Sequence, residues 1–217
     1  MNLYERAEAV ICKHFADTRI TLWGTDVLTV EQQTHIRSKP RPYILSAIEL
    51  LDALGAPNIV EIGCMRLPMN HSLEEFDPVC CNDGHSTLFW AATGKPVWSV
   101  DIDKNACYLA AGYVQAYPNT KVVWGDGIKF LAKFQQPIGL LYLDGWDVIP
   151  GTDYAEKHLL AYQAARPRLA ATSLILIDDT DLLMGGKGKL VLPAAIRDGY
   201  ELIAFGRQTM LLRAGSR

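Results

Sequence analysis

The chain has 217 residues, of which 49% are hydrophobic and 21% charged, and its formal net charge is −3. This length fits one large domain with a substantial core. The net charge is slightly negative and no long basic run is present, so the sequence does not indicate nucleic-acid binding. No apolar run reaches membrane-spanning length, and the N-terminus lacks the apolar core of a signal peptide. We therefore expect a soluble, cytoplasmic protein that binds neither nucleic acid nor membrane.

The cysteines indicate a reducing compartment rather than a disulfide framework. The sequence holds 5 of them, an odd number at irregular spacing. Cys64, Cys80 and Cys81, together with His71, could suggest zinc. However, no CxxC spacing is present, and adjacent cysteines cannot easily both serve one tetrahedral ion. Buried thiols in a packed loop are the favoured interpretation.

Residues 1–42 are predicted to form a helical extension or lid ahead of the main domain. Apolar residues recur at helical spacing over residues 2–16, and prolines then break any regular element. A helix is predicted from Tyr43 to Leu54, where the main domain, residues 43–217, begins. Such N-terminal helices could cover a ligand or provide the surface of a homodimer.

Strands and helices alternate regularly along the main domain. The predicted strands are 58–63, 97–101, 121–124, 139–143, 173–177, 200–205 and 208–213. The predicted intervening helices are 84–92, 104–115, 127–134, 153–165 and 193–198. Gly206-Arg207 predicts a hairpin between the last two strands. The whole predicts an α/β fold with a Rossmann-like, doubly wound, mainly parallel seven-stranded sheet and a C-terminal antiparallel hairpin.

The first strand–helix–strand unit has the features of a nucleoside-binding edge. Its first strand ends in Glu61-Ile62-Gly63, its helix begins at Gly84-His85-Ser86-Thr87, and its second strand ends in Asp101. Parallel strands place these ends at one edge of the sheet, where open α/β sheets bind ligands. A glycine lets a ligand approach the backbone, and a carboxylate can accept from both hydroxyls of a ribose. Because GxGxxG is absent, a dinucleotide is not favoured. Residues 64–83 form an insertion in this loop.

Glu61-Ile62-Gly63 and Asp101-Ile102-Asp103 resemble the first two motifs of class I S-adenosylmethionine-dependent methyltransferases. The resemblance implies S-adenosylmethionine as the cofactor. The residues it implies for cofactor binding are Glu61, Gly63, Gly84, Ser86, Thr87, Asp101, Ile102, Asp126, Gly127 and Asp144. We expect Glu61 to order the loop rather than touch the ligand. We expect Asp126 to cap a helix as well as to lie near the adenine amino group.

Three further acids end neighbouring predicted strands: Asp144, Asp178 and Asp179. Like charges that converge at one rim raise pKa values or demand a cation, and Mg²⁺ prefers oxygen ligands. The pattern resembles the metal-dependent O-methyltransferases, catechol O-methyltransferase among them, and implies these three acids as magnesium ligands. Two departures are Asp179, where that family commonly has asparagine, and Asp147, near where it often has a lysine base. The alternative is that the acids border the pocket without metal.

The catalytic candidates are Asp144 and His85, either of which could act as a base toward an acceptor hydroxyl. His158 is expected to pack or be solvated, and Lys187 to serve surface solvation or lid closure. The expected function is S-adenosylmethionine-dependent O-methylation of a small molecule such as a sugar, natural product or phenol, with or without Mg²⁺. The alternatives are a nucleotide-dependent oxidoreductase, or a non-catalytic protein of the same fold with a remodelled cofactor loop.

Overall fold

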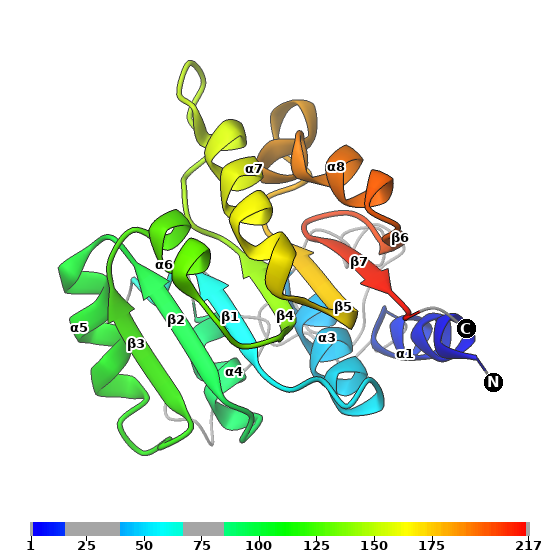
Figure 1. Ribbon diagram of the computed structural model, residues 1–217, viewed down its shortest axis with the longest axis horizontal. Helices are drawn as coiled ribbons and strands as arrows, with labels where there is room; N and C mark the ends of the chain where they lie inside the picture. Colours follow the sequence, from blue (N-terminus) through cyan, green and yellow to red (C-terminus); the bar gives the residue numbers. More distant parts are fainter. Residues whose placement is uncertain (1, 16–39, 67–84, 216–217) are drawn as a thin grey trace, which may run out of the picture.

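A computed structural model describes residues 2–15, 40–66 and 85–215 (Figure 1). Within these residues the strands form a 7-stranded sheet in the order β3-β2-β1-β4-β5-β7-β6. They are β1 Ile59–Ile62, β2 Val97–Asp101, β3 Thr120–Trp124, β4 Ile138–Leu143, β5 Leu169–Ile177, β6 Glu201–Ala204 and β7 Thr209–Arg213. β7 runs antiparallel to both β5 and β6, and the other pairs are parallel. The predicted fold is confirmed, hairpin included.

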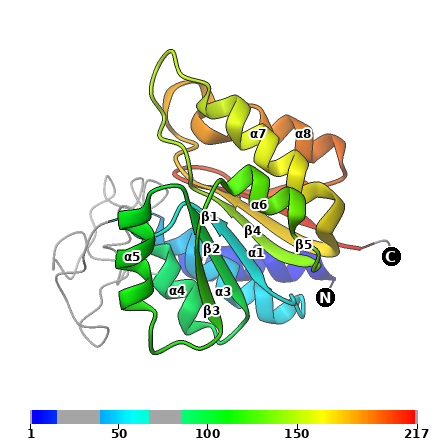
Figure 2. The ribbon, with the colours of Figure 1, turned by 60° about the vertical axis from the view of Figure 1, so that its left-hand side comes forward.

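Helices cover both faces of the sheet (Figures 1 and 2). On one face lie α1 Leu3–Phe15, α3 Arg41–Ala53, α4 Ser86–Ala92 and α5 Lys104–Tyr113; on the other lie α6 Gly127–Lys133, α7 Tyr154–Ala165 and α8 Val191–Arg197. None of the helices in the described parts of the chain combines the length and apolar character that a membrane span needs.

The strand sequences are almost continuously apolar because both faces of the sheet are covered. All of β4 is buried. Its Leu140 and Tyr142 pack with α1 and α3, whereas Leu141 and Leu143 pack with α7 and α8. This alternation follows from the two-residue period of a strand. A sheet held on both faces gives its carboxyl edge a fixed geometry.

Several local features differ from the sequence expectation. β5 begins at Leu169, four residues before the predicted start, with a register shift against β4. Between β5 and α8, the segment Leu183–Gly188, η4, consists of short 3-10 turns that meet at a kink, where Met184, Gly185 and Gly186 have non-helical dihedral angles. Cys64 is a buried free thiol, as expected. Most of the predicted insertion, with Cys80 and Cys81, lies outside the described residues.

Candidate active site

A cavity of about 250 Å³ opens at the carboxyl edge of the sheet. Five of the predicted cofactor residues line it: Gly63, Asp101, Ile102, Asp126 and Gly127. The wall on the β4 and α7 side is completed by Gly145, Trp146 and Lys157, which were not among the predicted cofactor residues. Gly84 lies outside the described residues. The edge therefore gathers the acids that end β2 and β3 around one space.

Asp101 is fixed by two backbone amides. Its Oδ2 accepts a hydrogen bond of 2.9 Å from Cys64 N, and its Oδ1 accepts one of 2.8 Å from Asp103 N. A carboxylate has about four lone-pair sites, so two remain for a ligand. Asp101 thereby joins the loop after β1 to the end of β2 and still offers acceptors to the cavity.

Gly63 is required by close packing as well as by any ligand. Its φ is +95°, a left-handed conformation, and a Cβ built on it would lie 2.5 Å from the carbonyl oxygen of Asp144. Both the conformation and the contact exclude other side chains. The loops after β1 and β4 therefore touch through their backbones, and Gly145 joins the cavity wall, whereas Asp144, also predicted to bind the cofactor, does not line this cavity.

Asp126 caps α6, as predicted. Its Oδ1 accepts from Ile128 N at 2.9 Å and from Lys129 N at 3.1 Å. It also lines the cavity. The two interpretations of this residue are compatible, because Oδ2 is not used in the capping bonds.

Glu61 lies in the interior and is a hub of hydrogen bonds rather than part of a cavity wall. It is 0% exposed. Its carboxylate accepts from Ser86 Oγ at 2.5 Å, Ser99 Oγ at 2.5 Å, Thr87 Oγ1 at 2.7 Å and Trp90 Nε1 at 3.1 Å. Burial raises the pKa of Glu61 to about 7, although the hydroxyl donors oppose this. Glu61 therefore holds α4 against β1, in agreement with the ordering role expected for it.

The hydroxyls of Ser86 and Thr87 serve the same interior network. Thr87 Oγ1 lies 3.1 Å from the amide nitrogen of Met65, which donates to it. Neither Glu61 nor Thr87 lines any described cavity, whereas Ser86 borders a second, smaller one. Their part in cofactor binding remains a prediction, and their observed contacts shape the loop.

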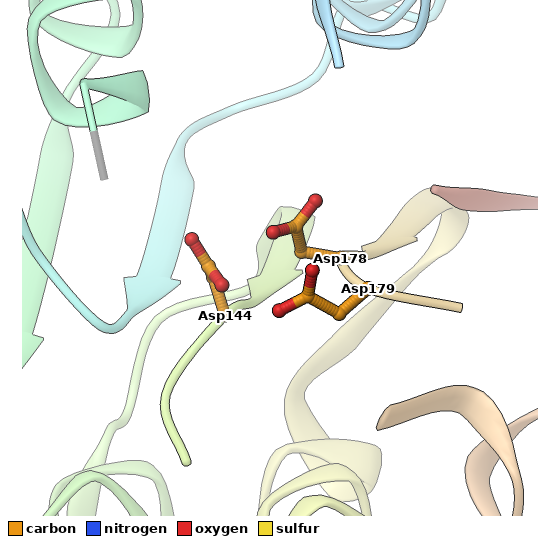
Figure 3. Close-up of side chains that lie close together, drawn as sticks. All are labelled: Asp144, Asp178 and Asp179. Carbon is orange, nitrogen blue, oxygen red and sulfur yellow. The ribbon is translucent and has the colours of Figure 1, made fainter. Parts of the chain in front are cut away.

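The predicted meeting of Asp144, Asp178 and Asp179 is borne out (Figure 3). One carboxylate oxygen from each lies within 4.8 Å of the others. The three side chains follow β4 and β5 and turn toward one another. Burial, and then the charge of Asp144, raise the pKa of Asp178 to about 8. Three acids this close together favour a positive charge among them.

The structure supplies that cation from the chain itself, and the expectation for Lys187 was wrong. Lys187 is not at the surface; it is 1% exposed. Its Nζ lies 2.5 Å from Asp144 Oδ1 and 2.9 Å from Asp179 Oδ2. Burial alone would lower the pKa of Lys187, but the three carboxylates raise it further than burial lowers it, so the ammonium stays charged.

Arg207 and Gln208, which sequence reasoning missed as site residues, complete the cluster. Arg207 lies 2.6 Å from Asp179 Oδ1 and 3.4 Å from Asp178 Oδ2. Gln208 Nε2 donates to Asp178 Oδ1 at 2.8 Å. The only sequence signal was a polar pair at a hairpin turn, directly before a strand. Arg207 and Lys187 bring positive charge to an acidic rim, and Gln208 adds a neutral donor.

A second cavity, about 30 Å³ in volume, lies beside the cluster. The predicted catalytic pair, His85 and Asp144, both line it, together with Asp178 and Arg66. Asp147, by contrast, forms an ion pair of 3.0 Å with Arg66. The small cavity thus brings both predicted catalytic residues to one space.

His158 packs in the interior, as expected. Its Nδ1 lies 2.7 Å from Tyr154 O, and its ring meets Trp146 edge-on with centroids 5.1 Å apart. Burial lowers its pKa to about 4, so His158 is neutral near pH 7. It therefore supports Trp146, a wall residue of the larger cavity, from behind.

No family model matches the chain, and no curated protein matches it. Among solved structures, it is similar to a methyltransferase from Geobacter sulfurreducens, with a TM-score of 0.55 and 15% identity over 100% of this chain and 90% of that chain. It is also similar to the O-methyltransferase from Bacillus cereus in complex with SAH, with a TM-score of 0.51 and 10% identity over 96% and 91% of the two chains. The fold is that of the class I S-adenosylmethionine-dependent methyltransferases.

Proposed function

We propose that this protein is an S-adenosylmethionine-dependent methyltransferase that methylates a hydroxyl group of a small molecule. The observation that carries the proposal is the position of Asp101, Ile102 and Asp126 around the cavity of about 250 Å³, next to Gly63. This is the arrangement that a nucleoside needs, with an acid for the ribose, an apolar wall for the base and an acid for an exocyclic amine. The O-methyltransferase named above supports hydroxyl as the acceptor.

Each residue has a definite part in this proposal. The cofactor supplies an electrophilic methyl group. Asp101 would accept from the ribose hydroxyls, and Asp126 would accept from the adenine amine. Gly63, which admits no side chain, keeps the loop close to the ligand. The protein must then hold the acceptor in line with the methyl group and remove its proton, for which Asp144 and His85 border the small cavity.

Binding of S-adenosylmethionine to the purified protein tests the proposal. We expect micromolar affinity by calorimetry and little affinity for NAD. Asp101→Asn should weaken binding about 10- to 100-fold, because a hydrogen bond to a charged group contributes about 1.5–3 kcal/mol. The matched control is Asp103→Asn, which changes the same charge two residues away. Asp103 caps α5 by accepting from Asn105 N, and asparagine caps equally well.

The control should bind S-adenosylmethionine like the wild type. Equal losses in both variants would mean that net charge, not the ribose contact, governs affinity. A wild-type protein that binds NAD but neither S-adenosylmethionine nor its demethylated product would overturn the proposal in favour of a nucleotide-dependent oxidoreductase.

A further inference from the structure

The acids of the cluster are engaged by donors from the chain. Every carboxylate oxygen of Asp144, Asp178 and Asp179 has a protein donor within 3.5 Å. The donors are Lys187 and Tyr142 on Asp144, Gln208 and Arg207 on Asp178, and Arg207 and Lys187 on Asp179. Each oxygen of the cluster therefore already faces a donor from the chain.

The backbone around Lys187 is built to deliver its side chain inward. Gly186 has φ +48° and ψ −136°, a conformation open in practice only to glycine. A Cβ there would lie 1.7 Å from the carbonyl oxygen of Asp179, and one on Gly188 would lie 2.9 Å from Thr180 Cγ2. Asp179 is itself left-handed, with φ +51°. The turn η4 thus lies directly on the strand end that carries two of the acids.

A divalent ion does not fit this arrangement. Mg²⁺ requires oxygen ligands at about 2.0–2.1 Å in an octahedron. Lys187 Nζ bonds oxygens of Asp144 and Asp179 at 2.5 and 2.9 Å, so it occupies the space between them. An ion bound to the same oxygens would touch a buried ammonium, and the repulsion between the two cations would be strong away from water. The three acids carry the charge of a metal site, but the ammonium of Lys187 occupies the space between Asp144 and Asp179.

We propose that Lys187 takes the place of a divalent metal, so that the acid cluster binds no Mg²⁺ and methyl transfer by this protein is independent of metal. Lys187 is then a positioning residue, which holds the Asp144 carboxylate at the edge of the small cavity while Arg207 and Gln208 hold Asp178. The metal independence of the reaction rests on the proposed methyltransferase function, whereas the absence of metal binding is a property of the protein alone.

Titration of the full chain with Mn²⁺, a spectroscopic probe that accepts the same oxygen ligands as Mg²⁺, tests the proposal. We expect no stoichiometric binding to the wild type and no effect of MgCl₂ or EDTA on its melting temperature. Lys187→Met keeps a long apolar side chain and removes the charge, so this variant should gain an Mn²⁺ site. Lys189→Met is the matched control, because Lys189 is an exposed lysine two residues further along. It should remain unable to bind Mn²⁺.

Stoichiometric Mn²⁺ binding to the wild type, abolished in Asp178→Asn, would overturn the proposal, and this result does not depend on any lysine variant folding. A folded Lys187→Met variant that binds no Mn²⁺ would also contradict it. Calorimetry with S-adenosylmethionine on the same preparations separates the two proposals. If cofactor binding fails while the Mn²⁺ results are as expected, only the methyltransferase function is lost.

Discussion

Replacement of Glu61 by alanine should lower the free energy of unfolding by about 3–5 kcal/mol, because it leaves buried donors without their shared acceptor. The donors are Ser86, Thr87, Ser99 and Trp90. Glu61→Gln is the matched variant. Its amide oxygen can accept from the Trp90 indole, which only donates, and its amide nitrogen can donate to hydroxyls. Glutamine should therefore retain most of the stability that alanine loses.

Comparison of the wild type with Glu61→Gln also reports the ionisation of Glu61. Its folded pKa is about 7 against an ordinary 4.5, so the folded state keeps a proton that the unfolded chain has already lost. The stability that this proton gives is fully present below pH 4.5 and is lost as the pH rises through about 7. The loss is about 3 kcal/mol.

Urea unfolding at pH 5, 6, 7 and 8 measures this loss. The wild type should lose stability over this range, and Glu61→Gln should lose less. Asp178, whose pKa is also raised, contributes in the same direction in both proteins, so the difference between the two curves isolates Glu61. Parallel curves would show that Glu61 is ionised in the folded state throughout.

Gly186→Ala should be the other severe substitution. The added Cβ would lie 1.7 Å from the carbonyl oxygen of Asp179, so the turn that carries Lys187 must move. We expect a loss of about 3 kcal/mol or more in the free energy of unfolding. Gly55→Ala is the control, since Gly55 has a similar φ of +58° but nothing within 4 Å of its Cβ position.

The free energy of unfolding of the control should fall by only about 1–2 kcal/mol, because its single cost is the strain of an alanine in a left-handed conformation. Thermal unfolding of both variants measures the difference. Equal destabilisation would mean that the turn adjusts at no cost, and that contact with Asp179 does not determine where Lys187 lies.

The sheet and its carboxyl edge could be predicted from the sequence because both depend on local patterns. Apolar runs bounded by turn residues define the strands, and parallel strands joined through helices end at one edge. The position at the carboxyl edge of the sheet could therefore be predicted, without any knowledge of packing, for Asp101, Asp126 and Asp144. The N-cap role of Asp126 was predictable for the same reason, since it depends on amides two and three residues away.

The burial of Lys187 could not be predicted, because its cause lies elsewhere in the chain. A polar, glycine-rich segment normally lies at the surface. This segment turns inward because the ends of β4 and β5 present carboxylates to the ammonium of Lys187. The sequence around Lys187 gives no sign of those carboxylates. Arg207 and Gln208 were missed for a related reason. They reach Asp178 only because β7 inserts next to β5, and the sequence at that point indicates no more than a turn.

The position of β7 between β5 and β6 also orders events during synthesis. Asp178 and Asp179 leave the ribosome before Lys187, and Arg207 and Gln208 follow later still. Until then the acids cannot form the ion pairs and hydrogen bonds of the cluster, and β5 lacks the neighbour that pairs its outer edge. The first strands can form their parallel core while translation continues. We therefore expect the candidate catalytic rim to be the last part of the sheet to form, because its contacts have a long sequence separation.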